Sequence, residues 1–385
     1  MRTRWIAGAL LASAFTMTAG PASAQERFTL RGDQAAVYNL VGEVTVAAGR
    51  GSDVVVEVIR GGADAAELRI GRRSVAGWPA LVIEYPDDDI VYPRLGMRSR
   101  SQFNVADDGT FGDGLLRMTI DEEGFSSGRG GSRGDRRIRV SGGGRGFEGW
   151  ADLRVFVPEG KAIALYLGVG RVNISNVDGD VRVRSMSGSV SASNVSGSTW
   201  IETGSGGVRA ERIAGHTSIS TGSGSIDAVD IHGGRVDLET GSGSIEAADI
   251  SGTGVRIETG SGGVQVTSIA AQAVRVNTGS GGITVHGLTA RDLELDTGSG
   301  SINGELLSDV RNASIETGSG GVTLRVPEDL GAEIVINSGS GGISTDLPIQ
   351  LFEQRRSYLR GRIGDGDGRI VVSTGSGSVR LRSRG

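Results

Sequence analysis

One short string recurs through the second half of the chain and constrains its fold more than any other feature. Thr-Gly-Ser-Gly begins at Thr203, Thr221, Thr240, Thr259, Thr278, Thr297, Thr317 and Thr374. From Thr203 to the variant Ser-Gly-Ser-Gly at Ser338, successive copies are 18, 19, 19, 19, 19, 20 and 21 residues apart. Degenerate copies at Ser185 and Leu167 extend the series to eleven units. A unit this short cannot bury its own apolar face, so it must stack on its neighbours.

Alignment of the units shows which side chains face inward. The residues two before and five after the first residue of each copy are aliphatic in all eleven units. Between these columns apolar and polar residues alternate, as in residues 255–259 (Val-Arg-Ile-Glu-Thr), and this period of two indicates a half-buried strand. The repeat therefore predicts an all-β protein, a single-stranded β-solenoid (β-helix) with coils of about 19 residues.

The eight threonines are predicted to form a structural ladder along one corner of the solenoid. Each coil is expected to run as strand, Gly-Ser-Gly corner, strand and second corner. The corner glycines are expected to supply positive φ angles for a sharp bend. The threonine hydroxyls could point either into the corner or out to solvent, and the sequence leaves both orientations open.

The first 24 residues resemble a signal peptide. Arg2 and Arg4 precede a short apolar stretch, and small residues then lead to a predicted cleavage between Ala24 and Gln25. A retained membrane anchor is the alternative. Cleavage predicts an exported protein that is periplasmic, outer-surface or secreted. Because the removed segment carries two arginines and no acid, the net charge would change from −5 to −7.

The remaining chain divides into three predicted parts. Residues 25–85 contain short strand-like runs, expected to form β-rich N-terminal coils or a cap over the open strand edge. Residues 86–150 form a Gly/Ser/Arg-rich insertion that is expected to be partly disordered. Residues 151–385 are the solenoid repeat domain, with a loop or one irregular coil at about 347–368. The mature chain contains no segment predicted to span a membrane.

Composition excludes several functions. The chain has no cysteine, which removes disulfides, thiolate metal sites and cysteine nucleophiles. With a negative net charge and one lysine, Lys161, it lacks the clustered basic residues of a nucleic-acid surface. The recurring Gly-Ser-Gly-Gly has neither the lysine nor the following helix of a phosphate loop. No cofactor and no metal are predicted.

Few residues suggest catalysis or ion binding. His216, His232 and His286 fall at non-equivalent repeat positions and are interpreted as surface residues, although a Ser-His-Asp triad stays open. A partly acidic column is interpreted as a solvated face and not as paired catalytic carboxylates; it comprises Glu202, Glu239, Glu258, Asp296 and Glu316. Asp365 and Asp367 form either an acidic turn or, with backbone carbonyls, a site for one ion.

The run at residues 152–160 (Asp-Leu-Arg-Val-Phe-Val-Pro-Glu-Gly), followed by the serial units, resembles the adhesin-type family of bacterial β-strand repeat proteins, domain of unknown function 4097 (DUF4097). The Gly-Asp-Gly-Asp-Gly stretch at 364–368 is similar to the closing element of that family. The resemblance spans residues 35 to 385 and implies an exported or envelope-associated β-solenoid. It supplies no catalytic motif.

Three functions compete at this point. The first is an adhesin-like binding or scaffold protein without catalysis, which recognises a surface ligand such as a glycan or an envelope protein and can self-associate end to end or laterally. The second is a β-helix polysaccharide lyase or hydrolase that acts on cell-surface glycans. The third is binding to ice or a crystal surface through a flat array of hydroxyls.

Overall fold

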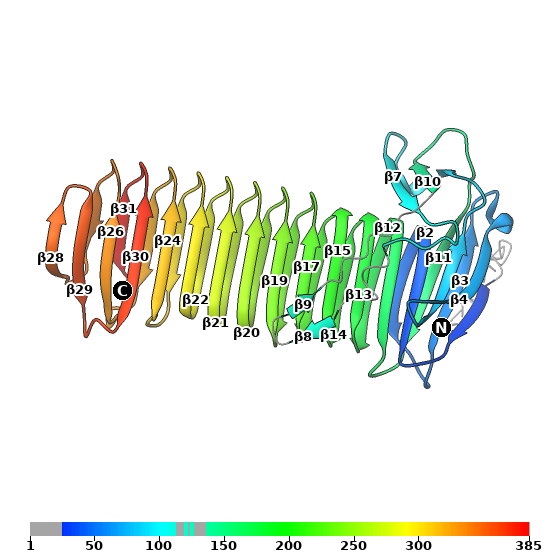
Figure 1. The fold of residues 1–385 in the computed structure, drawn as a ribbon, viewed down its shortest axis with the longest axis horizontal. Coiled ribbons are helices and arrows are strands. Elements are labelled where there is room, and N and C mark those ends of the chain that lie inside the picture. Colours follow the sequence, from blue (N-terminus) through cyan, green and yellow to red (C-terminus); the bar gives the residue numbers. More distant parts are fainter. Residues whose placement is uncertain (1–24, 113–118, 122–123, 127–135, 385) are drawn as a thin grey trace, which may run out of the picture.

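The computed structural model describes residues 25–112, 119–121, 124–126 and 136–384. Within this part the chain is almost entirely β-structure, with only two short 3-10 helices, η1 (Ala65–Glu67) and η2 (Pro93–Leu95). Figure 1 shows the strands lying side by side in a long stack, with additional strands at the N-terminal end. The predicted signal peptide lies outside the described residues, and the structure begins at Gln25.

The stack has two rows of strands, one on each side of the apolar core. We name the row whose strands end at the repeat threonines the anchor sheet. In stacking order it contains β4 (Arg69–Val75), β5 (Trp78–Glu84), the first halves of β2 (Gln34–Ala48) and β12 (Ala162–Asp178), β13 (Val181–Ser187), β15 (Thr199–Ser205), β17 (Thr217–Thr221), β19 (Arg235–Thr240), the second halves of β20 (Ile245–Thr259), β21 (Val264–Thr278) and β22 (Ile283–Thr297), then β24 (Asn312–Thr317), β30 (Gly368–Thr374), β26 (Ala332–Asn337), β29 (Tyr358–Ile363) and β28 (Gln350–Arg355).

The other row, the opposite sheet, is built from the alternate strand of each coil. It contains β1 (Gln25–Leu30), β3 (Val54–Gly61), β11 (Trp150–Val157), the second halves of β2 and β12, β14 (Val190–Ser196), β16 (Val208–Ala214), β18 (Ile226–His232), the first halves of β20, β21 and β22, then β23 (Ile302–Leu306), β25 (Val322–Val326), β31 (Val379–Ser383) and β27 (Ile343–Thr345).

Register places like residues on top of one another. In the anchor sheet Ile257 pairs with Val276 and Val276 with Leu295, in parallel and 19 residues apart, and all three are fully buried. The outward neighbours on the same strands are polar and partly exposed. Because side chains alternate across a strand, each coil buries its aliphatic columns between the two sheets and presents its charged columns to solvent.

Strands of the opposite sheet contain a residue in the left-handed region, at a point where the paired register skips one position. These residues occupy one column, with φ between 53° and 60°: Asn176, Asn194, Arg212, Asp230, Asp249 and Ser268. Gly287 follows at the same position with φ of 72°. Asn and Asp tolerate this conformation better than other non-glycine residues. A bend within these strands is therefore encoded at this column.

The N-terminal end is closed by strands whose pairing differs from that of the repeats. β2 stacks in parallel on β12, and the two outermost strands pair antiparallel, β4 with β5 and β1 with β3. The hydroxyl of buried Tyr85 lies 2.8 Å from two acceptors for its single proton, Asn39 Oδ1 and Val41 O. Asn39 Nδ2 donates to Ala151 O at 2.7 Å. Residues 25–85 thus form an ordered cap.

The part of the insertion at residues 86–150 that the structure describes contains two small sheets. β6 (Asp89–Val91), β10 (Arg136–Ser141) and β7 (Arg100–Val105) form a three-stranded sheet, and β8 (Thr119–Asp121) pairs with β9 (Gly124–Ser126). Phe103 and Phe111 are buried, and Phe111 contacts the stacked rings of Tyr38 and Tyr166 edge-on. This apolar contact fixes the insertion on the outer face of the first coils. Residues 113–118, 122–123 and 127–135, which include most of the Ser/Gly/Arg-rich run, lie outside the described residues.

The prediction of a loop at 347–368 is wrong. This segment contains the antiparallel hairpin β28–β29, and β29 also pairs antiparallel with β26. The stacking order changes as well, since Thr374 pairs with Thr317, and Ser338 lies in the coil beyond it. The last coil of the sequence is therefore inserted before the preceding one, and the hairpin covers the end of the anchor sheet (Figure 1).

Candidate ligand-binding groove

The threonine ladder has a structural role inside the corner. All eight threonines are buried. Thr278 Oγ1 donates to Gly262 O of the preceding coil at 2.8 Å and accepts a hydrogen bond from Gly281 N at 3.1 Å. The same donor bond recurs at the other seven threonines at 2.7–3.2 Å: Thr203, Thr221, Thr240, Thr259, Thr297, Thr317 and Thr374. The hydroxyls point inward, so the ladder is not a ligand surface.

The positive φ angles expected of the corner glycines are not found at most of the repeat corners. Glycines of the repeat corner such as Gly260 and Gly262 do not have a positive φ. They are needed because stacked corners approach closely: a Cβ on Gly262 would lie 1.9 Å from Gly243 O, and one on Gly260 would lie 2.3 Å from Gly241 O. Close approach of backbone to backbone, and not a left-handed bend, therefore explains the glycine at these positions.

The acidic column lies on the outer face of the anchor sheet, as its repeat position predicts. Glu258, Asn277, Asp296 and Glu316 pair in successive coils. Burial, together with the charges of Glu316 and Glu294, raises the pKa of Asp296. Among the described residues, no group of three or more His, Asp or Glu is arranged to hold a metal ion.

The three histidines lie in different coils and have different partners. His216 Nδ1 accepts a hydrogen bond from Arg235 N at 3.2 Å, and His286 Nδ1 lies 3.5 Å from Glu305. His232 lies between two partners, with Nδ1 2.6 Å from Ser251 Oγ and Nε2 2.5 Å from Asp230 Oδ1.

The contacts of His232 resemble a Ser-His-Asp triad, but the ring nitrogens are exchanged relative to that of serine proteases. The side chains of His232 and Asp230 are 54% and 43% exposed. Ser251 is partly buried. A catalytic triad works in a site that excludes water, so this exposed arrangement is weak support for catalysis.

The Gly-Asp-Gly-Asp-Gly segment forms a turn between β29 and β30. Asp367 N donates to Asp365 Oδ1 at 3.3 Å, and both aspartates are exposed. The acidic-turn interpretation accounts for this geometry.

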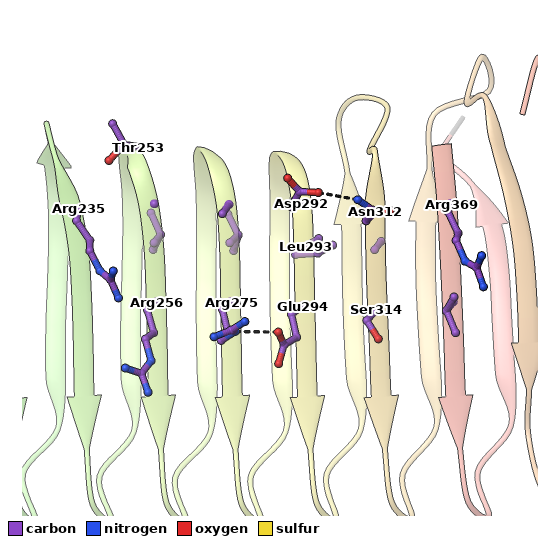
Figure 2. Close-up of a pocket in the computed structure, with 16 residues that line it drawn as sticks. Arg235, Thr253, Arg256, Arg275, Asp292, Leu293, Glu294, Asn312, Ser314 and Arg369 are labelled. Carbon is purple, nitrogen blue, oxygen red and sulfur yellow. Dashed lines mark hydrogen bonds and ion pairs between the residues drawn. The ribbon is translucent and has the colours of Figure 1, made fainter. Parts of the chain in front are cut away.

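A groove crosses the outer face of the anchor sheet, and none of its residues was singled out from the sequence. It has a volume of about 550 Å³ and is lined by residues of β19, β20, β21, β22, β24 and β30. Figure 2 shows the lining side chains in rows along these neighbouring strands. Because strands are spaced by about 4.8 Å, six strands make the groove roughly 24 Å long.

The groove exists because one outward column carries small residues in two successive coils. Arg235 and Asp292 occupy this column on either side, whereas the intervening coils carry Gly254 and Ala273. Their missing side chains uncover the edges of buried residues beneath, such as Val274. The floor is therefore apolar and the ends are polar.

Ion pairs hold the rim of the groove. Arg275 Nε lies 2.8 Å from Glu294, and Arg256 Nη2 lies 2.6 Å from Glu258. Asn312 Nδ2 donates to Asp292 at 2.9 Å (Figure 2). Paired in this way, the charged groups are fixed in position and still expose donors and acceptors to a ligand. The lining contains no aromatic ring.

Two rows of parallel repeat strands around a shared apolar core make this chain a β-solenoid-like repeat protein. Its ends are closed by antiparallel strands. Residues 213–382 match the family model described as Toastrack DUF4097. This match confirms the resemblance seen in the sequence over residues 213–382.

Comparison with other proteins adds little beyond the family. No curated protein matches the chain. Among solved structures, a "putative cell adhesion protein" from Clostridium sporogenes is similar at 8% identity, over 94% of this chain and 99% of that chain, with a TM-score of 0.18. A TM-score this low supports no argument about fold or function. In the described residues, no helix has the length and hydropathy needed to cross a membrane.

Proposed function

We propose that this chain is an exported, adhesin-like binding protein whose coils of about 19 residues hold an extended envelope polymer without modifying it. The groove across six strands of the anchor sheet is the observation that carries this proposal. Its length suits a polymer that runs along the stack, because each coil adds one further set of contacts. The family match is compatible with this function, since the family resemblance supplies no catalytic motif.

The chemistry of the rim favours a ligand rich in hydroxyl groups. Arg256 and Arg275 are neutralised by Glu258 and Glu294, so the rim offers hydrogen-bond donors and acceptors with little net charge. Without an aromatic ring, recognition relies on these hydrogen bonds and on the apolar floor. A neutral cell-surface glycan fits this combination.

Binding can be tested with variants on one strand. Ala273→Phe fills the floor of the groove, whereas Gln265→Phe adds the same side chain to the outward face of the opposite sheet on β21. The unsubstituted chain from residue 25 onward and the Gln265 variant are expected to be retained on insoluble peptidoglycan or on members of a neutral glycan array. The Ala273 variant is expected to lose that retention. Equal retention of both variants, or no retention of the unsubstituted chain, would contradict the proposal.

The catalytic alternative is tested in the same samples. Lyase or hydrolase activity releases reducing ends from the glycan, whereas binding alone does not. Release that disappears in a Ser251→Ala variant would identify the His232 arrangement as catalytic and would overturn the non-catalytic function.

A further inference from the structure

A second pocket lies at the N-terminal end of the stack, remote in sequence from the groove. It has a volume of about 730 Å³ and is lined by residues of β1, the β1–β2 turn, β4, and the β4–β5 turn with the start of β5. β1 ends the opposite sheet and β4 ends the anchor sheet. The pocket therefore lies between the closing strands of the two sheets.

Arginine dominates this pocket. Among the described residues, its lining contains no carboxylate and no aromatic ring, and consists of Arg27, Thr29, Leu30, Arg31, Arg72, Arg73, Ser74, Gly77 and Pro79. Arg27 and Thr29 share the exposed face of β1, and Arg72 and Ser74 share the exposed face of β4. Positive charge from three separate segments thus surrounds one cavity.

Three of the four arginines form no ion pair within the part of the chain that the structure describes. The side chains of Arg27, Arg31 and Arg72 form no ion pair or hydrogen bond with any residue that the structure describes. Arg27 lies opposite Glu57 in the register of β1 and β3, yet no ion pair joins them. Arg73 is the exception, since it contacts Glu84 and donates to Asp108 O.

Two of the acids next to the pocket are already engaged. Asp33 Oδ1 lies 2.6 Å from Lys161 Nζ, and Glu26 Oε1 lies 2.6 Å from Arg60 Nε. Neither carboxylate supplies the charge that the pocket lacks. This distinguishes the pocket from the groove, where carboxylates on the same sheet pair with Arg256 and Arg275.

Unpaired arginines close together repel one another, and this repulsion opposes folding. In a chain with a net charge of −5, a cavity with this much positive charge is a specific departure from the rest of the molecule. A bound anion would remove the repulsion, and sites that are costly without ligand are typical of binding sites.

We propose that this pocket binds a phosphate-bearing ligand. Guanidinium groups present a planar fork of donors that matches the oxygens of phosphate. A phosphate group carries a charge of about −1.5 to −2 at neutral pH, so it balances several arginines better than a single carboxylate. A cavity of about 730 Å³ also exceeds what one phosphate fills, which leaves room for a second phosphate or for the rest of a headgroup.

The test uses the mature chain, residues 25–385, and two matched double variants. Arg31→Gln with Arg72→Gln removes two pocket charges. Arg291→Gln with Arg311→Gln removes two exposed charges from corners of the repeat region. Near-ultraviolet circular dichroism establishes that all three proteins are folded. Binding of inorganic pyrophosphate is measured by calorimetry, and sedimentation is measured with vesicles of phosphatidylcholine alone or mixed with phosphatidylglycerol.

The mature chain and the repeat-region variant are expected to bind pyrophosphate equally. The pocket variant is expected to bind at least about tenfold more weakly, because each charge-assisted hydrogen bond is worth about that factor. Retention on phosphatidylglycerol vesicles that depends on the pocket arginines identifies a lipid headgroup as the source, and pyrophosphate binding without such retention identifies a soluble phosphate. Equal affinity of the two variants, absence of both kinds of binding, or tighter pocket-dependent binding of polygalacturonate would overturn the proposal.

Discussion

The substitution Thr278→Val tests the inward orientation of the threonine ladder. Valine matches threonine in shape but removes the hydroxyl that donates to Gly262 O and accepts from Gly281 N, at 2.8 and 3.1 Å. Both partners then lose a hydrogen bond in a buried corner. An unsatisfied buried group costs about 1–3 kcal/mol, so we expect a loss of about 2–4 kcal/mol in the free energy of unfolding.

Thr278→Ser is the matched control, because it keeps the hydroxyl and removes only a methyl group. Burial of that methyl is worth about 0.8 kcal/mol. Ser338 shows that serine is accepted at a corner of this type, where its hydroxyl donates to Gly341 O at 2.6 Å. The valine variant is therefore expected to be less stable than the serine variant, even though valine is the more apolar residue.

Repeat arrays can unfold in more than one step, so urea denaturation is combined with a local measurement. Hydrogen exchange followed by mass spectrometry reports on the amide of Gly281 in peptides spanning 278–283. This amide is expected to exchange faster in the valine variant and at the normal rate in the serine variant. A valine variant that is as stable as the serine variant, with unchanged exchange, would refute a hydrogen-bonding role for the ladder.

Three further outcomes are expected in urea denaturation. Gly262→Ala places a Cβ 1.9 Å from a backbone oxygen and is expected to cost about 3 kcal/mol or more. Gly263→Ala places its Cβ 3.6 Å from Gly282 O and is expected to change stability by less than about 0.5 kcal/mol; similar losses in the two variants would refute the close-approach argument. Tyr85→Phe removes a buried hydroxyl with three partners and is expected to cost about 1–3 kcal/mol; an unchanged denaturation midpoint would contradict its role in the cap. Burial raises the pKa of Asp296 in the folded state, so its ionised form opposes folding above that pKa and the stability rises as the pH falls through it. Asp296→Asn is therefore expected to be more stable than the unsubstituted chain near pH 7 and equally stable at about pH 3. A stability advantage of the Asn variant that grows on acidification would show that the sign of this effect is wrong.

Repetition made most of the fold predictable from the sequence. When eleven units carry aliphatic residues at the same positions, any pairing other than in-register stacking would expose apolar columns to water. This reasoning placed Ile257 and Val276 in the core and the acidic column on the outer face, and both assignments agree with the structure. The adhesin-type family resemblance followed from the same repeat.

The candidate sites were harder to predict because neither follows from the regular positions of the repeat. The groove arises where Gly254 and Ala273 interrupt a column of larger side chains, and a search for small residues in successive coils could have found it. The arginine pocket gives no such signal. Arg27, Arg31 and Arg72 belong to different strands and turns, and only the fold of the cap brings them to one cavity.

The corner string that marks the repeat thus determined, by itself, an all-β stack, because only in-register stacking buries all the aliphatic columns that recur at a fixed spacing. Tertiary structure alone decided the inward orientation of the threonine hydroxyls, the close approach that requires glycine, and the position of the Thr374 coil between the coils of Thr317 and Ser338. The physical reason is that similar coils offer nearly the same apolar surface in any order. The hairpin β28–β29 pairs with β26, so it holds that coil at the end of the stack and leaves the inner position to the last coil.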